Sequence, residues 1–168
     1  ALLRPVYSTR MKTSSVSTQI DHYRHQETYR VRYDDLDTYR HVNNKAFLSF
    51  IEDARVRYML DAAGFRHHYT GSIGAMIVHA SIDYTSQIQA LEEVTVLTRT
   101  ARFGSSSVTL HHLLLSGEPG SAPETKRVSA VSTSVVVTMD LEANSPIHTP
   151  EDLVHKVGEW EVITPEQS

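Results

Sequence analysis

Hydrophobic and polar residues change their spacing several times along this chain, and each change marks a predicted element. Over residues 28–33 (TYRVRY) they alternate, which predicts a half-buried strand with three residues on one face: Tyr29, Val31 and Tyr33. The stretch that follows, DDLDTYRHVNN, is polar and has no apolar periodicity, so it is predicted to be a loop. The asparagines that end this loop are favourable helix caps.

After the loop, apolar residues recur three or four positions apart, which is the spacing of an amphipathic helix. We therefore predict one continuous helix over residues 44–63, and Gly64 supplies its stop signal. The apolar stripe of this helix consists of Phe47, Ile51, Ala54, Tyr58 and Ala62.

Four further segments rich in Val, Ile, Thr and Leu are predicted to be strands: residues 75–84, 94–102, 107–115 and 128–139. Gly104 marks a turn between the second and third of them, and residues 117–125, with two prolines, form a longer hairpin loop. Such short connections indicate antiparallel pairing. Residues 151–157 are predicted to form one short helix. One long apolar helix against one antiparallel sheet is an α+β arrangement.

Length and composition narrow the class of protein. The chain has 168 residues, of which 40% are hydrophobic, enough for one globular domain. The formal net charge is −4 with both signs mixed along the chain, which argues against a nucleic-acid partner. There is no cysteine, so disulfides, cysteine-ligated zinc and a cysteine nucleophile are excluded. No apolar run approaches the roughly 20 residues that a membrane span needs.

The N-terminal residues 1–22 differ in composition from the rest. They are rich in Ser and Thr and carry basic residues, but no acidic residue before Asp21. Such a segment is typical of an organellar transit peptide or of a disordered terminus, and the sequence leaves both readings open. We expect the folded domain at residues 23–160 and a tail at 161–168, in a protein of the cytoplasm or the mitochondrial matrix.

Residues 29–58, YRVRYDDLDTYRHVNNKAFLSFIEDARVRY, closely resemble the signature of the 4-hydroxybenzoyl-CoA thioesterase-like family of hotdog proteins. The resemblance extends with weaker matches over residues 28–140. It implies a hotdog fold, in which an antiparallel sheet of five or six strands wraps around one long central helix, and it implies acyl-CoA thioesterase activity. The matching positions are Tyr33, Asp35, Asp37, His41, Val42, Asn43, Asn44, Phe47, Glu52, Ala54 and Arg55.

The resemblance also implies roles for individual residues in thioester hydrolysis. Asp37 occupies the catalytic position, as a general base or as a nucleophile. The backbone N–H of Asn44, in the first turn of the predicted helix, corresponds to the oxyanion donor, and free N–H groups and the helix dipole favour negative charge there. His41 either orients Asp37 or the substrate, or it caps the loop. Without the motif, DDLD would be read as a solvated turn, and this reading remains favoured for Asp35.

Substrate contacts are expected from Tyr39 and Phe47 near the mouth of the site. Ser106 and Ser107 correspond to family serines along the pantetheine path, although a simple turn would also place serines there. Arg102 is the basic residue available for the phosphates of coenzyme A.

Three residues depart from the patterns of related families, and the first two alter the mouth of the site. Arg40 stands where a small residue, often Gly, is usual, and Tyr39 stands where plant acyl-carrier-protein thioesterases have Asn. Ser86 replaces a frequent Pro. Glu52 and Arg55 are interpreted as a structural ion pair on the helix.

Two alternatives to an acyl-CoA thioesterase stay open: an acyl-acyl-carrier-protein thioesterase and a non-catalytic acyl-binding hotdog subunit. A hotdog hydratase is disfavoured, because its Asp and His are separated by four residues and those of this chain by three. We expect no cofactor and no metal, since the adjacent histidines at 67–68 and 111–112 lack zinc-site spacing. A single helix layer leaves sheet edges to cover, so we expect a homodimer or a tetramer.

Overall fold

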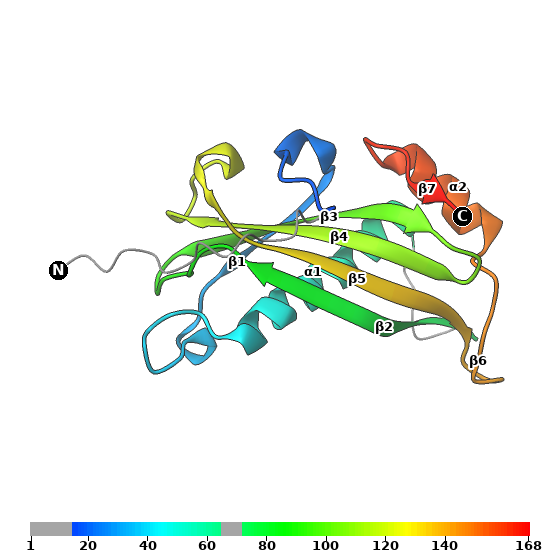
Figure 1. Ribbon diagram of the computed structural model, residues 1–168, viewed down its shortest axis with the longest axis horizontal. Helices are drawn as coiled ribbons and strands as arrows, with labels where there is room; N and C mark the ends of the chain where they lie inside the picture. The colour runs from blue at the N-terminus through cyan, green and yellow to red at the C-terminus, as the bar shows by residue number, and fades with distance from the viewer. Residues whose placement is uncertain (1–14, 65–71) are drawn as a thin grey trace.

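A curved antiparallel sheet wraps around the long helix α1 (Asn44–Ala63) in the computed structural model, which describes residues 15–64 and 72–168 (Figure 1). The strand order is β1-β3-β4-β5-β2, and these neighbours are all antiparallel. The α+β hotdog architecture predicted from the sequence is thereby confirmed. The bounds of the main strands are β1 (His25–Arg30), β2 (Ile73–Tyr84), β3 (Glu93–Phe103), β4 (Ser107–Gly117) and β5 (Arg127–Asp140).

Helix α1 has the predicted bounds, because its end signals are local. The side chain of Asn43 accepts a hydrogen bond from the backbone N–H of Ala46 at 2.9 Å, as an N-cap does. At the other end, Gly64 adopts a left-handed conformation with φ 68°. The predicted apolar stripe is buried, and Ala54 and Tyr58 are fully enclosed between the helix and the sheet.

The first strand differs from its prediction. It begins at His25 rather than Thr28 and ends at Arg30, and Tyr33 lies in a 3₁₀ turn, η2 (Tyr33–Asp35), with 89% of its surface exposed. The cause is a contact between neighbours in sequence: the carboxylate of Asp35 accepts the backbone N–H of Arg32 at 2.8 Å and turns the chain out of the sheet. Alternation alone does not reveal such a turn.

Part of the segment expected to lie outside the domain has a defined place on it. Residues 15–24 include the 3₁₀ turn η1 (Ile20–His22). Val16 and Tyr23 are buried against the sheet face that points away from α1, on a cluster formed by Leu97, Leu113, Leu115 and Val131. Residues 15–22 of the N-terminal segment therefore pack on the domain, and the targeting-like character of residues 1–22 stays a prediction. The remainder of the segment, residues 1–14, lies outside the described residues.

The C-terminal part closes one end of the α1 layer. Helix α2 (Glu151–Trp160) is longer than the predicted 151–157 and packs Leu153 and Val157 near the end of α1. Glu161, expected in a tail, is buried and accepts a hydrogen bond from Tyr58 Oη. Of two short strands, β6 (Ser145–Pro146) pairs with β5, and β7 (Glu166–Gln167) pairs with β3.

None of the helices in the described ranges is long and apolar enough to span a membrane.

Candidate active site

The segment before α1 folds into a tight hairpin. Leu36 and Val42 form an antiparallel bridge, and inside it the backbone N–H of Asp37 donates to the carbonyl oxygen of His41 at 2.8 Å. The N–H of Arg40 donates back to the carbonyl of Asp37 at 3.1 Å. Arg40 has φ 63°, a left-handed conformation that a three-residue hairpin loop commonly requires. Gly, which the resemblance leads one to expect at the position of Arg40, adopts this conformation at no steric cost.

The carboxylate of Asp37 is exposed and held in one orientation by this hairpin. Its Oδ1 accepts the backbone N–H groups of Tyr39 at 2.8 Å and His41 at 3.1 Å. No donor from the part of the chain that the structure describes reaches Oδ2. One carboxylate oxygen is therefore fixed by the loop, and the other is available to water or substrate.

The first turn of α1 directly follows the same hairpin. The N–H of Asn43 donates to the carbonyl of Asp35 at 2.8 Å, which fixes the angle at which the chain enters the helix. The N–H groups of Asn44 and Lys45 precede the first intrahelical hydrogen bond, so the helix itself gives them no acceptor. The helix start thus offers N–H donors and a positive dipole end close in sequence to Asp37. The side chain of Asn44 is exposed, and only its backbone serves this arrangement.

Asp35 and Asp37 have different surroundings, although one residue separates them. Asp35 is only 4% exposed, and its carboxylate also binds the guanidinium of Arg32, with Nη2 3.0 Å from Oδ1. Its oxygens are thus used to shape the turn. This is the structural role that the sequence favours for Asp35.

A second loop, residues 85–92, packs against the second half of the hairpin and supports it. The N–H of Val42 donates to the carbonyl of Ile88 at 2.9 Å, and His41 forms a bridge with Gln89. Sequence reasoning missed this support, because the contact joins two segments that are far apart in the sequence. The departure Ser86 belongs to it: its Oγ donates to the carbonyl of Val128 at 2.9 Å.

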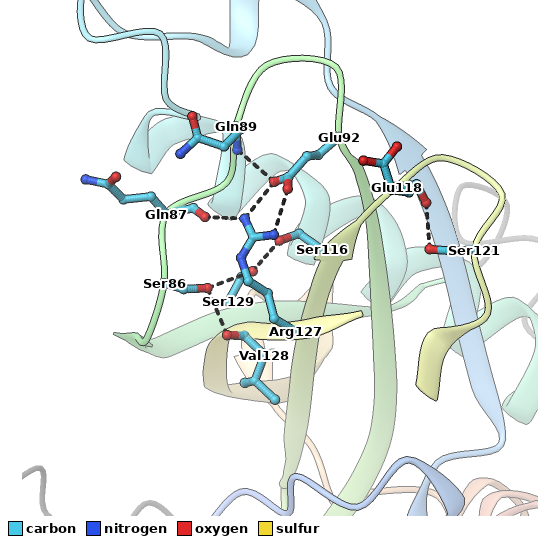
Figure 2. A network of polar contacts seen from close by, with 10 residues as sticks. All are labelled: Ser86, Gln87, Gln89, Glu92, Ser116, Glu118, Ser121, Arg127, Val128 and Ser129. Atoms are coloured by element: carbon cyan, nitrogen blue, oxygen red, sulfur yellow. Dashed lines mark hydrogen bonds and ion pairs between the residues drawn. The ribbon is translucent and has the colours of Figure 1, made fainter. Parts of the chain in front are cut away.

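Arg127, the first residue of β5, anchors the support loop (Figure 2). Its guanidinium donates to both carboxylate oxygens of Glu92, at 2.6 and 2.7 Å, and to the carbonyl of Gln87 at 2.5 Å. Burial pushes the pKa of Glu92 upward, but hydrogen bonds from Arg127 and from the N–H of Gln89 outweigh it and hold that pKa below its usual value. Glu92 is therefore charged at neutral pH, as the ion pair requires.

The residues predicted to bind substrate lie in two separate regions. Tyr39 is at the tip of the hairpin and 79% exposed. Phe47 is buried, and its ring packs edge-on against Tyr84, with ring centroids 5.0 Å apart. The remaining predicted residues are in or beside the β3–β4 turn, at the far end of the sheet: Arg102, Ser106 and Ser107.

The distance between these two regions is large within one chain. Glu93, at the Asp37 end of β3, and Phe103 are ten strand steps apart, about 33 Å.

The ion pair expected on α1 is present, with Arg55 Nη2 3.9 Å from Glu52 Oε1. The catalytic and binding roles assigned to individual residues stay predictions.

Comparison with known proteins gives the family. A family model described as thioesterase-like superfamily matches residues 31–157, a range that includes the hairpin, all of α1 and strands β2 to β5. YsmA, an uncharacterized protein of Bacillus subtilis (strain 168), is 32% identical over 125 residues, which are 71% of this chain and 82% of YsmA.

Solved structures agree with the fold. A thioesterase from Thermus thermophilus, complexed with coenzyme A and Zn, is 28% identical with a TM-score of 0.68, over 83% of this chain and 96% of that one. YbaW, a probable thioesterase from Escherichia coli, is 23% identical with a TM-score of 0.67, over 79% of this chain and 95% of its own. The second similarity is evidence of shared fold alone.

Proposed function

This chain belongs to the thioesterase-like superfamily, and we propose that it hydrolyses an acyl-CoA thioester to the free acid and the thiol. The observation that carries the proposal is the orientation of Asp37. Two backbone N–H groups hold its Oδ1, no donor from the described residues reaches its Oδ2, and the first turn of α1 directly follows the hairpin. A general base or nucleophile and an oxyanion site are the groups that thioester hydrolysis needs.

In the proposed reaction the thioester carbonyl oxygen points to the backbone N–H of Asn44. As a general base, Asp37 takes a proton from water while the water oxygen bonds to the carbonyl carbon. The tetrahedral intermediate then collapses, the C–S bond breaks, and the thiolate takes up the proton. As a nucleophile, the Asp37 carboxylate would instead bond to the carbonyl carbon, the C–S bond would break, and the thiolate would leave and take up a proton from water. Water would then cleave the resulting acyl anhydride, releasing the free acid and restoring the Asp37 carboxylate. Both routes use the same open oxygen, Oδ2.

We propose that the site is completed by a second copy of the chain. Strand β2 is a sheet edge with exposed apolar side chains, including Met76, Ile77 and Val78 at 45–58% exposure. Such an edge favours pairing with another strand. Antiparallel pairing of two β2 strands about a twofold axis brings the β3–β4 turn of one chain to the Asp37 end of the other. The two regions that are about 33 Å apart in one chain would then meet across the interface.

The hollows in the structure agree with a shared site. Two hollows, of about 330 and 540 Å³, lie beside α2, and Asp37 lines neither of them. We propose that the pocket for the acyl group lies between subunits. The coenzyme A bound to the Thermus thermophilus relative supports acyl-CoA as the substrate class, and Arg102 at the β3–β4 turn is suitably charged for its phosphates.

The proposal is tested with a panel of acyl-CoAs of different chain length, aliphatic and aromatic, and a thiol-detecting reagent. We expect turnover of at least one member, and loss of roughly 10² or more in kcat for Asp37→Asn with little change in KM. Hydrolysis of the acyl-carrier-protein thioester alone would move the substrate class to the carrier protein. A parent chain that binds acyl-CoA without turnover would be a binding module.

A further inference from the structure

Strand β1 and helix α1 face each other with matched spacing. Side chains on one face of a strand repeat about every 6.6 Å, and residues four apart on a helix repeat about every 6 Å. Three residues of β1 therefore each lie next to a charged residue of α1. Tyr29 donates to Asp53, Glu27 lies beside Arg57, and His25 lies beside Asp61.

The last of these pairs contains a buried histidine without a hydrogen bond. His25 is 4% exposed, packed between the rings of Tyr58 and Trp160. Neither of its ring nitrogens has a hydrogen-bond partner among the residues that the structure describes. Buried polar groups are nearly always paired, so an imidazole in this state points to a missing ligand.

Two carboxylates lie close to the Nε2 atom of this imidazole. Glu27 Oε1 and Asp61 Oδ2 are each 3.7 Å from Nε2, and the three ligand atoms all lie within 4.8 Å of one another. A separation of 3.7 Å is too long for a hydrogen bond. It is close to the spacing of about 3.4 Å between two ligand atoms on a tetrahedral zinc ion.

We propose that His25, Glu27 and Asp61 bind one divalent transition-metal ion of the zinc class. His25 supplies Nε2, and each carboxylate supplies one oxygen. Three protein ligands leave a position for water in a tetrahedral site. An imidazole ligand favours zinc over magnesium or calcium, which prefer sites made of oxygen atoms alone.

The electrostatics of the cluster suit a cation. Burial lowers the pKa of His25 despite the opposing charge of Asp61, which favours the neutral imidazole that metal binding needs. Burial raises the pKa of Glu27, and a bound cation would relieve that cost. Arg57 also approaches the cluster, but its Nε is 3.9 Å from Glu27 Oε2 and only 2.8 Å from Asp53 Oδ2, so Asp53 is its main partner.

The position of the cluster indicates a structural role for the ion. Asp61 lies in the last turn of α1, 17 residues after Asn44, which is about 26 Å along the helix from the proposed catalytic end. The metal would join edge strand β1 to the end of α1. Sequence spacing does not reveal this cluster, because the histidines that attract attention are adjacent pairs and Asp61 is 36 residues from His25.

The test uses the full chain after chelator treatment, with ZnCl₂ binding measured by calorimetry and by equilibrium dialysis with elemental analysis. We expect one zinc ion per chain and a rise in melting temperature on binding. Asp61→Asn, at a side chain that is 60% exposed, and Glu27→Gln should each weaken zinc binding at least about tenfold. Co²⁺ should give visible absorption bands that Asp61→Asn diminishes, whereas MgCl₂ should give no shift in melting temperature.

The matched control is Glu159→Gln, which removes the carboxylate of an exposed His–Glu pair on α2, with His155 Nε2 3.4 Å from Glu159 Oε1. The proposal requires zinc binding to survive this change. It is overturned if the parent binds no zinc, if Asp61→Asn and Glu27→Gln bind zinc as the parent does, or if Glu159→Gln is the variant that loses it.

Discussion

The backbone N–H of Val42 donates a hydrogen bond to the carbonyl oxygen of Ile88 at 2.9 Å, and this bond joins the hairpin that carries Asp37 to the loop that follows β2. The position of the proposed catalytic carboxylate therefore depends on a loop about 50 residues away in sequence. That loop depends in turn on Arg127, whose guanidinium holds Glu92 and Gln87. The proposed site is thus a surface hairpin supported by a charged network.

We predict that Arg127→Gln loosens the hairpin without unfolding the protein. The side chain of Arg127 is 40% exposed, so the loss in the free energy of unfolding should be about 1 kcal/mol. Hydrogen exchange at the Val42 N–H should become faster, because its acceptor loop is no longer anchored. Lys156→Gln, which removes an exposed ion pair on α2, is the control and should leave Val42 unchanged. Equal exchange in both variants would contradict the supporting role of residues 85–92.

Arg40→Gly should stabilise the protein. The left-handed region costs a residue with a side chain about 1–2 kcal/mol, whereas the greater freedom of Gly in the unfolded chain costs about 0.5–1 kcal/mol. With φ 63° at Arg40, the net gain should be about 0.5–1 kcal/mol, measured by urea unfolding. Arg40→Ala removes the same side chain but keeps the strain, so it should give no gain. A gain of equal size in Arg40→Ala would show that backbone strain is not the cause.

The parts of this fold that follow from local signals could be predicted from the sequence. The bounds of α1 depend on the cap Asn43, the glycine at 64 and the spacing between them, all within one stretch of chain. Tyr33 was misplaced because a side chain two positions later, Asp35, overrides the alternation by bonding the backbone of Arg32. The motif indicates Asp37, but nothing in it indicates Ile88, which contacts the hairpin, or Arg127, which anchors the loop that carries Ile88. Both contacts join segments that are far apart in the sequence and form only with the sheet.

A charge on the β2 edge should abolish the expected homodimer. Val78 is 58% exposed at an irregularity between Ile77 and His79, and Val78→Lys would place a charge on this edge strand, which disfavours its pairing with another strand. Light scattering at micromolar concentration should report a dimer for the parent and a monomer for the variant. Val162→Lys is the matched control, since Val162 is also 58% exposed but lies near the C-terminus. A parent that is monomeric would rule out the shared site.

The free energy of unfolding should depend on pH through His112. Burial, aided by the charges of Arg55, His111 and His25, lowers its pKa from 6.5 to about 3. The unfolded chain therefore binds the proton first as the pH falls, so stability is fully present above pH 6.5 and decreases below it, by up to about 1.4 kcal/mol per pH unit.

The variant His112→Gln isolates this contribution. Glutamine can still bond Thr98 and Ser134, the partners of the imidazole at 3.0 and 3.1 Å, but it does not titrate. Urea unfolding at several values between pH 7.5 and about pH 5 should give a shallower slope for the variant than for the parent. Parallel curves would mean that His112 is protonated equally in both states.

The last prediction separates the roles of the two neighbouring aspartates. Asp37 is exposed with one open oxygen, so Asp37→Asn should lower kcat by roughly 10² or more and leave the melting temperature nearly unchanged. Asp35 is buried and binds the backbone and guanidinium of Arg32, so Asp35→Asn should lower the free energy of unfolding by about 1–3 kcal/mol, with a clearly smaller loss of kcat.

Both variants are measured by thermal unfolding and by acyl-CoA hydrolysis on the same preparation, so that a loss of folded protein is not mistaken for a loss of chemistry. If Asp35→Asn folds like the parent and is inactive, the catalytic carboxylate is the buried one and the motif has been aligned two residues out of register. If both variants hydrolyse thioesters like the parent, the hairpin is only a turn. The geometry of this hairpin predicts a stable, inactive Asp37→Asn beside a destabilised, active Asp35→Asn, because Asp37 keeps an oxygen that the loop does not use, whereas both oxygens of Asp35 bind Arg32.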